Sequence, residues 1–325
     1  MTFFRASALA NNAHHAPRVL LVTLSNIGDL VLTTPALIAL HAAWPTALVD
    51  VVADQRSSSL LAHCPYLGDV FLRDKTAGLR GLIALVRALR RRRYLAVVDL
   101  RTDFLPFLLR TERRSMRFLV RQHLQDLHSV EQHLAVVNHL LQASGTPPAP
   151  RVWWPETTAT WAMTQKALLP GRVLALAPGA NWAGKCWPLT AFIDLAGQVA
   201  PRFESLLLLG SAAERDAAEA IAAASPLPSL NLAGTTSLLE VAAILAHCEA
   251  FVGNDSGLGH LAAAAGIPTL TVFGPGQPAR YRPWGPLAAI LCAPGGELAA
   301  LPASLVASAL FRHLAACKTT DQVGA

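Results

Sequence analysis

The sequence predicts an α/β protein with two domains, each built on a parallel sheet. At 325 residues, the chain is long enough for two domains of about 150 residues each. Short apolar runs alternate with longer amphipathic segments, which is typical of parallel strands joined by helices. A proline-rich stretch at 145–150 interrupts the series and predicts a domain boundary. We therefore expect two Rossmann-like domains, residues 1–150 and 151–325, facing each other across a cleft.

The first domain is expected to hold four strands and three main helices. Apolar, β-branched runs predict strands over 18–24, 48–53, 69–72 and 94–100. Periodicity predicts helices over 30–44, 78–93 and 128–143, and the second of these has leucines on one face and arginines on the other. Ser129 and Gln132 have the spacing of a capping box at the start of the third helix.

The second domain repeats the alternation. Strands are expected over 173–177, 205–209, 229–232, 250–253 and 269–273. Helices are expected near 191–200, 212–224, 238–247 and 256–265. A last helix over 304–316 is a candidate to cross back onto the first domain.

Composition excludes several classes of protein. With 53% hydrophobic and 15% charged residues, the chain can build large cores and is not globally disordered. No apolar run reaches the roughly 18 residues that a membrane-spanning helix needs. The five cysteines are scattered without a CxxC pair, which argues against a disulfide framework or a zinc site. The N-terminus lacks the features of a signal peptide, so we expect a cytoplasmic protein.

Positive charge is concentrated in the first half. Residues 1–165 carry 18 Lys and Arg against 11 Asp and Glu, whereas residues 166–325 carry 9 against 10. A basic face suits an anionic partner, and the run Arg90–Arg93 is either part of such a face or a solvated helix surface. Nucleic acid is not expected, because the interleaved aromatic residues of a stacking platform are missing around this run.

Four loops are candidates for chemistry, because ligands of parallel sheets bind beyond the carboxyl ends of the strands. These loops are 25–29, 178–185, 210–214 and 254–260. In the last, Gly257 and Gly259 lie at the start of a helix whose free N–H groups attract anions, and His260, one turn into the helix, adds a donor. An ordinary N-cap with two packing glycines is the alternative.

In each of the other three loops, one residue is a candidate for a chemical role. Lys185 lies in a glycine-rich loop that can hold a phosphate, although the loop is not a Walker A motif and a solvated lysine is the alternative. Glu214 follows a strand and a glycine, where acidic residues often bind ribose. Asp29 either caps the helix or complements its dipole, or it is a general base.

In combination, these segments resemble glycosyltransferase family 9, the ADP-heptose:lipopolysaccharide heptosyltransferases. The similar segments are RVLLVTLSNIGDLVLTTPAL (18–37), LALAPGANWAGKCWP (174–188), LLLLGSAAERDAAEAIA (206–222) and the stretch 231–275 with its DSGLGHLAAAAGIP motif. The resemblance implies a GT-B architecture and inverting transfer without an obligatory metal or other cofactor. It also implies an ADP-sugar donor on the second domain and an anionic lipid-linked glycan acceptor on the first, with peripheral contact at the inner face of the inner membrane.

The resemblance also implies roles for particular residues. Asp29 becomes the catalytic base. The implied donor-binding residues are Asn181, Lys185, Glu214, Thr236, Asp255, Ser256, Gly257 and His260. The candidate acceptor-binding residues are Ser25, Asn26, Arg101 and Asp103.

Other functions remain open at this point. The same fold and reaction could serve another nucleotide sugar or another acceptor, such as a surface polysaccharide or a protein. Nucleotide-sugar epimerases share the two-domain layout. A nucleotide-sugar-binding protein without transfer activity is the non-enzymatic alternative.

Overall fold

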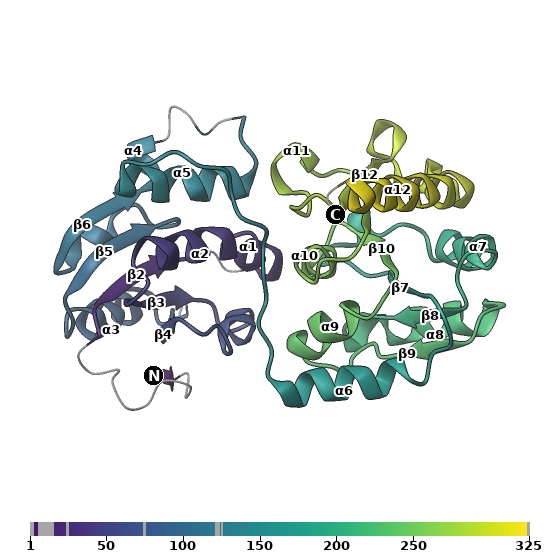
Figure 1. The fold of residues 1–325 in the computed structure, drawn as a ribbon, viewed down its shortest axis with the longest axis horizontal. Helices are drawn as coiled ribbons and strands as arrows, with labels where there is room; N and C mark the ends of the chain where they lie inside the picture. Colours follow the sequence, from purple (N-terminus) through teal and green to yellow (C-terminus); the bar gives the residue numbers. More distant parts are fainter. Residues whose placement is uncertain are drawn as a thin grey trace. The chain divides into compact units, whose positions relative to one another are not determined.

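The computed structural model divides the chain into two compact α/β units, Met1–Trp153 and Trp154–Ala325 (Figure 1). It describes residues 3–5, 16–23, 26–73, 76–120, 124 and 126–323. No helix among these residues is long and apolar enough to cross a membrane.

The first unit contains a six-stranded sheet in the order β1-β4-β3-β2-β5-β6. Its strands are β1 (Phe3–Arg5), β2 (Arg18–Val22), β3 (Leu48–Ala53), β4 (Leu67–Leu72), β5 (Tyr94–Asp99) and β6 (Thr111–Met116). All pairs are parallel except β1 with β4. The expectation of a wholly parallel sheet is therefore wrong at this edge, where a short strand of three residues can pair in either direction.

Strand β6 was not expected from the sequence, because the segment TERRSM is polar. An edge strand has one free side, and the middle of β6 is exposed while Ser115 and Met116 are buried. The apolar pattern that marks buried parallel strands is therefore not needed here.

Helices cover both faces of the first sheet. They are α1 (Ile27–Val31), α2 (Thr34–Ala43), α3 (Gly78–Leu89), α4 (Arg117–Val120) and α5 (Ser129–Leu141), with 3-10 turns η2 (Ser58–Leu61) and η3 (Leu105–Leu108). On one face, α3 and η3 share an apolar cluster with residues of β2 and β5. Helices α2 and α5 pack against each other.

Two helix predictions in this unit are corrected. The expected helix over 30–44 is divided into α1 and α2, with Thr33 as the N-cap residue of α2 and Pro35 in its first turn. Proline has no N–H to continue the hydrogen bonds of a preceding helix. The capping box of α5 uses His128 and Glu131 instead of Ser129 and Gln132, with the main-chain N–H of His128 donating to the Glu131 carboxylate at 2.9 Å.

The second unit has a six-stranded parallel sheet in the order β12-β11-β10-β7-β8-β9. Its strands are β7 (Val173–Ala177), β8 (Ser205–Leu208), β9 (Ser229–Asn231), β10 (Ala250–Asn254), β11 (Thr269–Phe273) and β12 (Ala288–Cys292). The first five coincide closely with the expected strands, and β12 was missed.

The helices of the second unit are α6 (Glu156–Lys166), α7 (Leu189–Val199), α8 (Arg215–Ala224), α9 (Leu238–Leu245), α10 (Gly257–Ala264), α11 (Pro278–Tyr281) and α12 (Ala303–Val323). Residues of α7, α8 and α12 form one apolar core with the sheet. Helix α12 contacts α7, β11 and β12 of its own unit. That it also reaches the first domain stays a prediction.

Candidate functional site

The order of the strands marks one position on the second sheet. Strands β7 and β10 are neighbours, and the chain proceeds from β7 outward to β8 and β9 but from β10 outward to β11 and β12. Ligands of open parallel sheets bind where the order reverses in this way, beyond the carboxyl ends of the strands. The loops that follow β7 and β10 therefore form the first candidate site.

Asn254 ties these two loops together. Its side chain is fully buried at the end of β10. Its Nδ2 donates to the carbonyl oxygen of Pro178 at 2.6 Å, and its Oδ1 accepts from the main-chain N–H of Trp187 at 2.9 Å. The sequence analysis did not single out Asn254, because neither partner is near it in the chain. These bonds hold both ends of the lysine-bearing loop against β10.

Lys185 and Asp255 meet at this point. The Lys185 Nζ lies 2.5 Å from Oδ2 of Asp255, whose side chain is 10% exposed. A buried carboxylate needs a counter-charge. Both residues are predicted donor contacts, but their positions in the sequence do not predict that they pair with each other. The pairing holds the Lys185 ammonium group at the strand edge, and the Lys185 side chain as a whole is 28% exposed.

The start of α10 adds polar groups next to this pair. Ser256 is the N-cap residue, but its hydroxyl does not cap the helix and has no hydrogen-bond partner among the described residues. Gly257 begins the helix, and His260 is buried within its first turn. Ser256, Gly257 and His260 therefore lie at a helix start, and that this helix start binds an anion stays a prediction.

Glu214 lies over the loop that follows β7. It closes a capping box with Ser211 at the start of η6 (Ala212–Glu214). A Cβ added to Gly179 would lie 2.4 Å from carbons of the Glu214 side chain, so glycine is needed at position 179 for this close approach. Glu214 is therefore positioned at the carboxyl edge, next to the loop that carries Lys185.

Two further expected donor residues lie around this edge. Asn181 is exposed in the loop between β7 and η5 (Ala183–Lys185). Thr236 follows β9 and donates a long hydrogen bond of 3.5 Å to the carbonyl oxygen of Leu232. The structure thus groups Lys185, Asp255 and Ser256, whereas Thr236 belongs to the loop after the edge strand.

In the first unit, the strand order reverses between β2 and β5. Asp29 lies in α1, which follows β2, and its Oδ2 accepts a hydrogen bond of 3.0 Å from Asn26. Burial raises the pKa of the Asp29 carboxyl, while the hydrogen bonds from Asn26 and the positive charge of Arg101 oppose that rise. Asn26 is the N-cap residue of α1, so Asp29 does not cap the helix, but Asp29 lies in the first turn, where a carboxylate complements the helix dipole.

Asp99 is a buried carboxylate that the sequence analysis missed. It ends β5 and accepts hydrogen bonds from the main-chain N–H groups of Arg101 at 2.9 Å and Thr102 at 2.7 Å. Burial raises the pKa of the Asp99 carboxyl, and the hydrogen bonds from Thr102 oppose that rise. This turn sets the direction of the chain at Arg101, which lines a pocket at the carboxyl edge together with Arg73 and Asp54.

The other expected acceptor residues differ in their settings. Asp103 has a positive φ of 61° and accepts a hydrogen bond of 3.0 Å from the main-chain N–H of Phe118, so its carboxylate is engaged in a local structural contact. Asn26 contacts Asp29. Ser25 lies outside the described residues.

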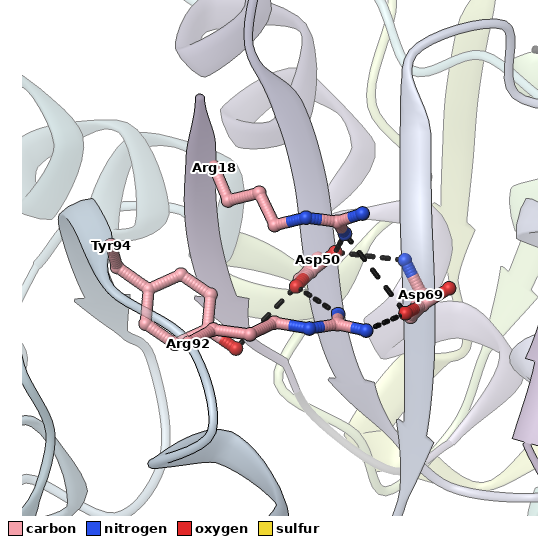
Figure 2. Close-up of polar contacts among 5 residues, drawn as sticks. All are labelled: Arg18, Asp50, Asp69, Arg92 and Tyr94. Carbon is pink, nitrogen blue, oxygen red and sulfur yellow. Dashed lines mark hydrogen bonds and ion pairs between the residues drawn. The ribbon is translucent and has the colours of Figure 1, made fainter. Parts of the chain in front are cut away.

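The run Arg90–Arg93 does not form a uniform solvated surface. Figure 2 shows that Arg92 turns inward to Asp50 and Asp69, next to Arg18 and Tyr94. Its Nη1 lies 2.6 Å from Oδ2 of the fully buried Asp50, and its Nη2 contacts Asp69. Arg18 pairs with the other oxygen of Asp50 at 2.5 Å. Arg92 is therefore part of a buried ionic network, and Arg90, Arg91 and Arg93 are exposed.

No group of three or more His, Cys, Asp or Glu side chains able to hold a metal is found in the part of the chain that the structure describes.

Comparisons with known proteins find similarity over most of the length of this chain. A family model described as glycosyltransferase family 9 (heptosyltransferase) matches residues 82–301. The chain is 27% identical over 291 residues to lipopolysaccharide heptosyltransferase 2 of Escherichia coli strain K12, covering 80% of this chain and 84% of that protein. It is 28% identical over 310 residues to lipooligosaccharide heptosyltransferase 2 of Haemophilus influenzae, covering 86% and 90%.

A solved structure, that of E. coli ADP-heptose LPS heptosyltransferase II, is similar with a TM-score of 0.74 and 25% identity, covering 93% of this chain and 99% of that chain. This likeness confirms the expected α/β fold of the GT-B class. The match to the family model includes the loops after β7 and β10, whereas Asp29 precedes it.

Proposed function

The chain belongs to glycosyltransferase family 9 (heptosyltransferase), and on that premise we propose that it transfers a heptose from ADP-heptose to an inner-core lipopolysaccharide or a related anionic, lipid-linked glycan. The observation that carries the proposal is the pairing of Lys185 with Asp255 beside the N-terminus of α10, at the point where the strand order reverses. A cation, a hydroxyl and main-chain N–H groups at one strand edge suit the diphosphate of a nucleotide sugar.

In the proposed donor complex, the diphosphate lies against Lys185, Ser256 and the N–H of Gly257. Asp255 holds the lysine in place before ADP-heptose arrives and balances its charge after ADP leaves. Glu214 takes the ribose hydroxyls, because it projects over Gly179 beside the same loop. The proposed contacts of the remaining donor residues are adenine for Thr236 and the phosphates for Asn181 and His260.

Asp29 is the proposed base. It accepts the proton of the acceptor hydroxyl while that oxygen forms a bond to the anomeric carbon. The bond from this carbon to the diphosphate oxygen breaks, and ADP leaves with the bonding electrons. A single displacement inverts the anomeric configuration. Lys185 and the N–H groups of α10 stabilise the departing negative charge, so the proposed transfer requires no metal or other cofactor.

The acceptor is proposed to meet the arginine-rich first unit. Ser25, Asn26, Arg101 and Asp103 are the proposed acceptor contacts, with Arg101 supplying positive charge at the strand edge. We propose that the protein acts in the cytoplasm, at the inner face of the inner membrane, where a lipid-linked acceptor is accessible to it.

A donor screen tests this function. The protein is incubated with a phosphorylated inner-core acceptor and, in turn, with ADP-heptose, ADP-glucose, UDP-glucose and GDP-mannose, and the free nucleotide is measured with and without EDTA. We expect acceptor-dependent release of ADP from ADP-heptose, unaffected by EDTA. Release from another nucleotide sugar alone would contradict the proposed donor, and loss of release in EDTA would contradict metal-free transfer.

The role of Lys185 can be separated from that of Asp255. A charge-assisted hydrogen bond is worth about 1.5–3 kcal/mol, so Lys185→Ala should weaken ADP binding by roughly one to two decades in calorimetry. The double variant Lys185→Ala/Asp255→Asn removes both charges of the pair. If Lys185 contacts phosphate, the double variant still binds ADP at least about tenfold more weakly than the wild type. Wild-type affinity in the double variant would mean that Lys185 only neutralises Asp255.

A further inference from the structure

Large apolar side chains are unusually exposed along one edge of the first unit. Five of them lie between residues 104 and 119: Phe104, Phe107, Leu108, Phe118 and Leu119. Phe107 and Phe118 are 61% and 68% exposed. Phenylalanine at this exposure is costly in water, and a cluster of such residues marks an interaction surface more often than scattered ones do.

Arginines accompany these side chains. Residues 104–120 contain four of them (Arg110, Arg113, Arg114 and Arg117) against one acidic residue, Glu112. Arg113 and Arg114 are exposed on β6, and Arg110 is exposed just before it. The segment therefore combines apolar surface with a net positive charge.

Two contacts connect parts of this apolar and basic segment. The guanidinium of Arg114 lies over the ring of Phe107, 5.5 Å from its centre, which links β6 to η3. The hydrogen bond from the N–H of Phe118 to Asp103 links the start of α4 to the residue before Phe104. We call the surface made by the five apolar residues and the four arginines the β6 edge patch.

Protection of a free sheet edge accounts for only part of this composition. Charged side chains on an edge strand discourage pairing with other chains, which explains arginines on β6. It does not explain exposed phenylalanines and leucines on both flanking turns, since these promote association. Aromatic and aliphatic side chains mixed with arginine are the composition of segments that lie in the interface of a bilayer with anionic headgroups.

We propose that the β6 edge patch docks the protein on the surface of an anionic lipid bilayer. The phenylalanines and leucines enter the headgroup region, and the four arginines bind lipid phosphates. The inference rests on the proposed function, because a lipid-linked acceptor gives the contact its purpose. It places the membrane contact on the β6 edge patch instead of Arg90–Arg93, which the sequence left open as part of a basic face or as a solvated helix surface. Arg92 of that run pairs with Asp50.

Sedimentation with vesicles tests the patch. The full chain is mixed with vesicles of phosphatidylcholine, or with vesicles in which about a quarter of the lipid is phosphatidylglycerol. We expect binding to the anionic vesicles that weakens as salt is added. Phe107→Ser/Phe118→Ser should lower the partition coefficient about tenfold or more. Arg113→Gln/Arg114→Gln should lower it by a similar factor, at roughly fivefold for each arginine.

Matched variants in the same chain control for general effects. Met163→Ser/Leu168→Ser removes two apolar side chains of equal exposure, 61% and 64%, from the second unit. Arg202→Gln/Arg215→Gln removes two exposed positive charges from the second unit. Both controls should change the partition coefficient by less than about threefold, because neither pair of side chains belongs to the patch.

Three outcomes would overturn the proposal. They are equal binding to neutral and anionic vesicles, control variants that lose as much binding as the patch variants, and patch variants that change only self-association in light scattering. Calorimetric ADP binding by the Phe107→Ser/Phe118→Ser variant should match the wild type. Failure of the donor screen would leave vesicle binding unaffected, so the two proposals fail separately.

Discussion

At the scale of single residues, the proposed role of Asp29 as the catalytic base can be tested by one substitution. Asp29→Asn keeps the size of the side chain while removing its ability to accept a proton. Because a positioned base contributes typically 10²–10⁴-fold, transfer should slow by about that factor while calorimetric ADP affinity is retained. Activity within about threefold of the wild type would be too small a loss for a missing base.

The surroundings of Asp29 predict a pH dependence. Burial raises its pKa, and the Asn26 hydrogen bonds favour the ionised form that a base requires. The rate kcat/KM should therefore fall as pH drops through this raised pKa. Asn26→Ala removes a donor to the carboxylate and should move the acidic limb of the profile to higher pH, with the plateau at high pH less affected. If the acidic limb does not move, either Asn26 does not affect the pKa of Asp29 or Asp29 is not the group that accepts the proton.

At the scale of elements, the ionic network around Asp50 joins β2, β3 and β4 to the segment before β5 (Figure 2). Gly68 is needed beside it, because a Cβ there would lie 2.1 Å from Oδ1 of Asp50. Two of the segments that the network connects, β2 and the start of β5, belong to strands that precede the proposed acceptor contacts at their carboxyl ends.

The network predicts that replacing Arg92 lowers the free energy of unfolding much more than replacing its neighbour Arg91. Arg92→Ala leaves a buried carboxylate without one of its two cations, and breaking such a pair typically costs about 3–5 kcal/mol. Arg91→Ala, at an exposed position, should change stability by about 0.5 kcal/mol or less. The urea concentration at the midpoint of unfolding is measured for both variants. Equal midpoints would mean that the ion pairs of Arg92 contribute no more to stability than the exposed Arg91 does.

At the scale of the whole molecule, the two units are expected to divide the two substrates. Hydrogen exchange of the full chain measures this division. Saturating ADP should slow exchange most at residues 178–187 and 254–260, which Asn254 joins. It should slow exchange much less around Asp99 and Arg101. Strongest protection within the first unit would contradict a donor site in the second.

Most strands could be predicted from the sequence because a buried parallel strand is a local pattern. Residues 48–53, 173–177 and 269–273 are strands over the same bounds as expected. Polar edge strands lack that pattern, so β6 was missed. The division of the first long helix was also missed, although Pro35 signals it.

The chemistry-bearing loops could likewise be found from the sequence, since a glycine-rich turn between a strand and a helix is a short motif with a known physical use. The resemblance to glycosyltransferase family 9 could be recognised from the sequence alone. The same holds for the candidate residues of loops 178–185 and 254–260.

Only the tertiary structure decided which of these side chains act on one another. Lys185 and Asp255 are 70 residues apart in the chain, and Arg92 and Asp50 are 42 apart. The sequence by itself determined the fold class, the loops and the types of charged group in them, because these depend on local patterns. Pairing of buried charges depends on the order and register of strands in the sheet. The fold therefore decided that Asp255 holds Lys185 at the strand edge. It also decided that Arg92 pairs with the buried Asp50, while β6 and the segments on either side of it carry exposed arginines and phenylalanines.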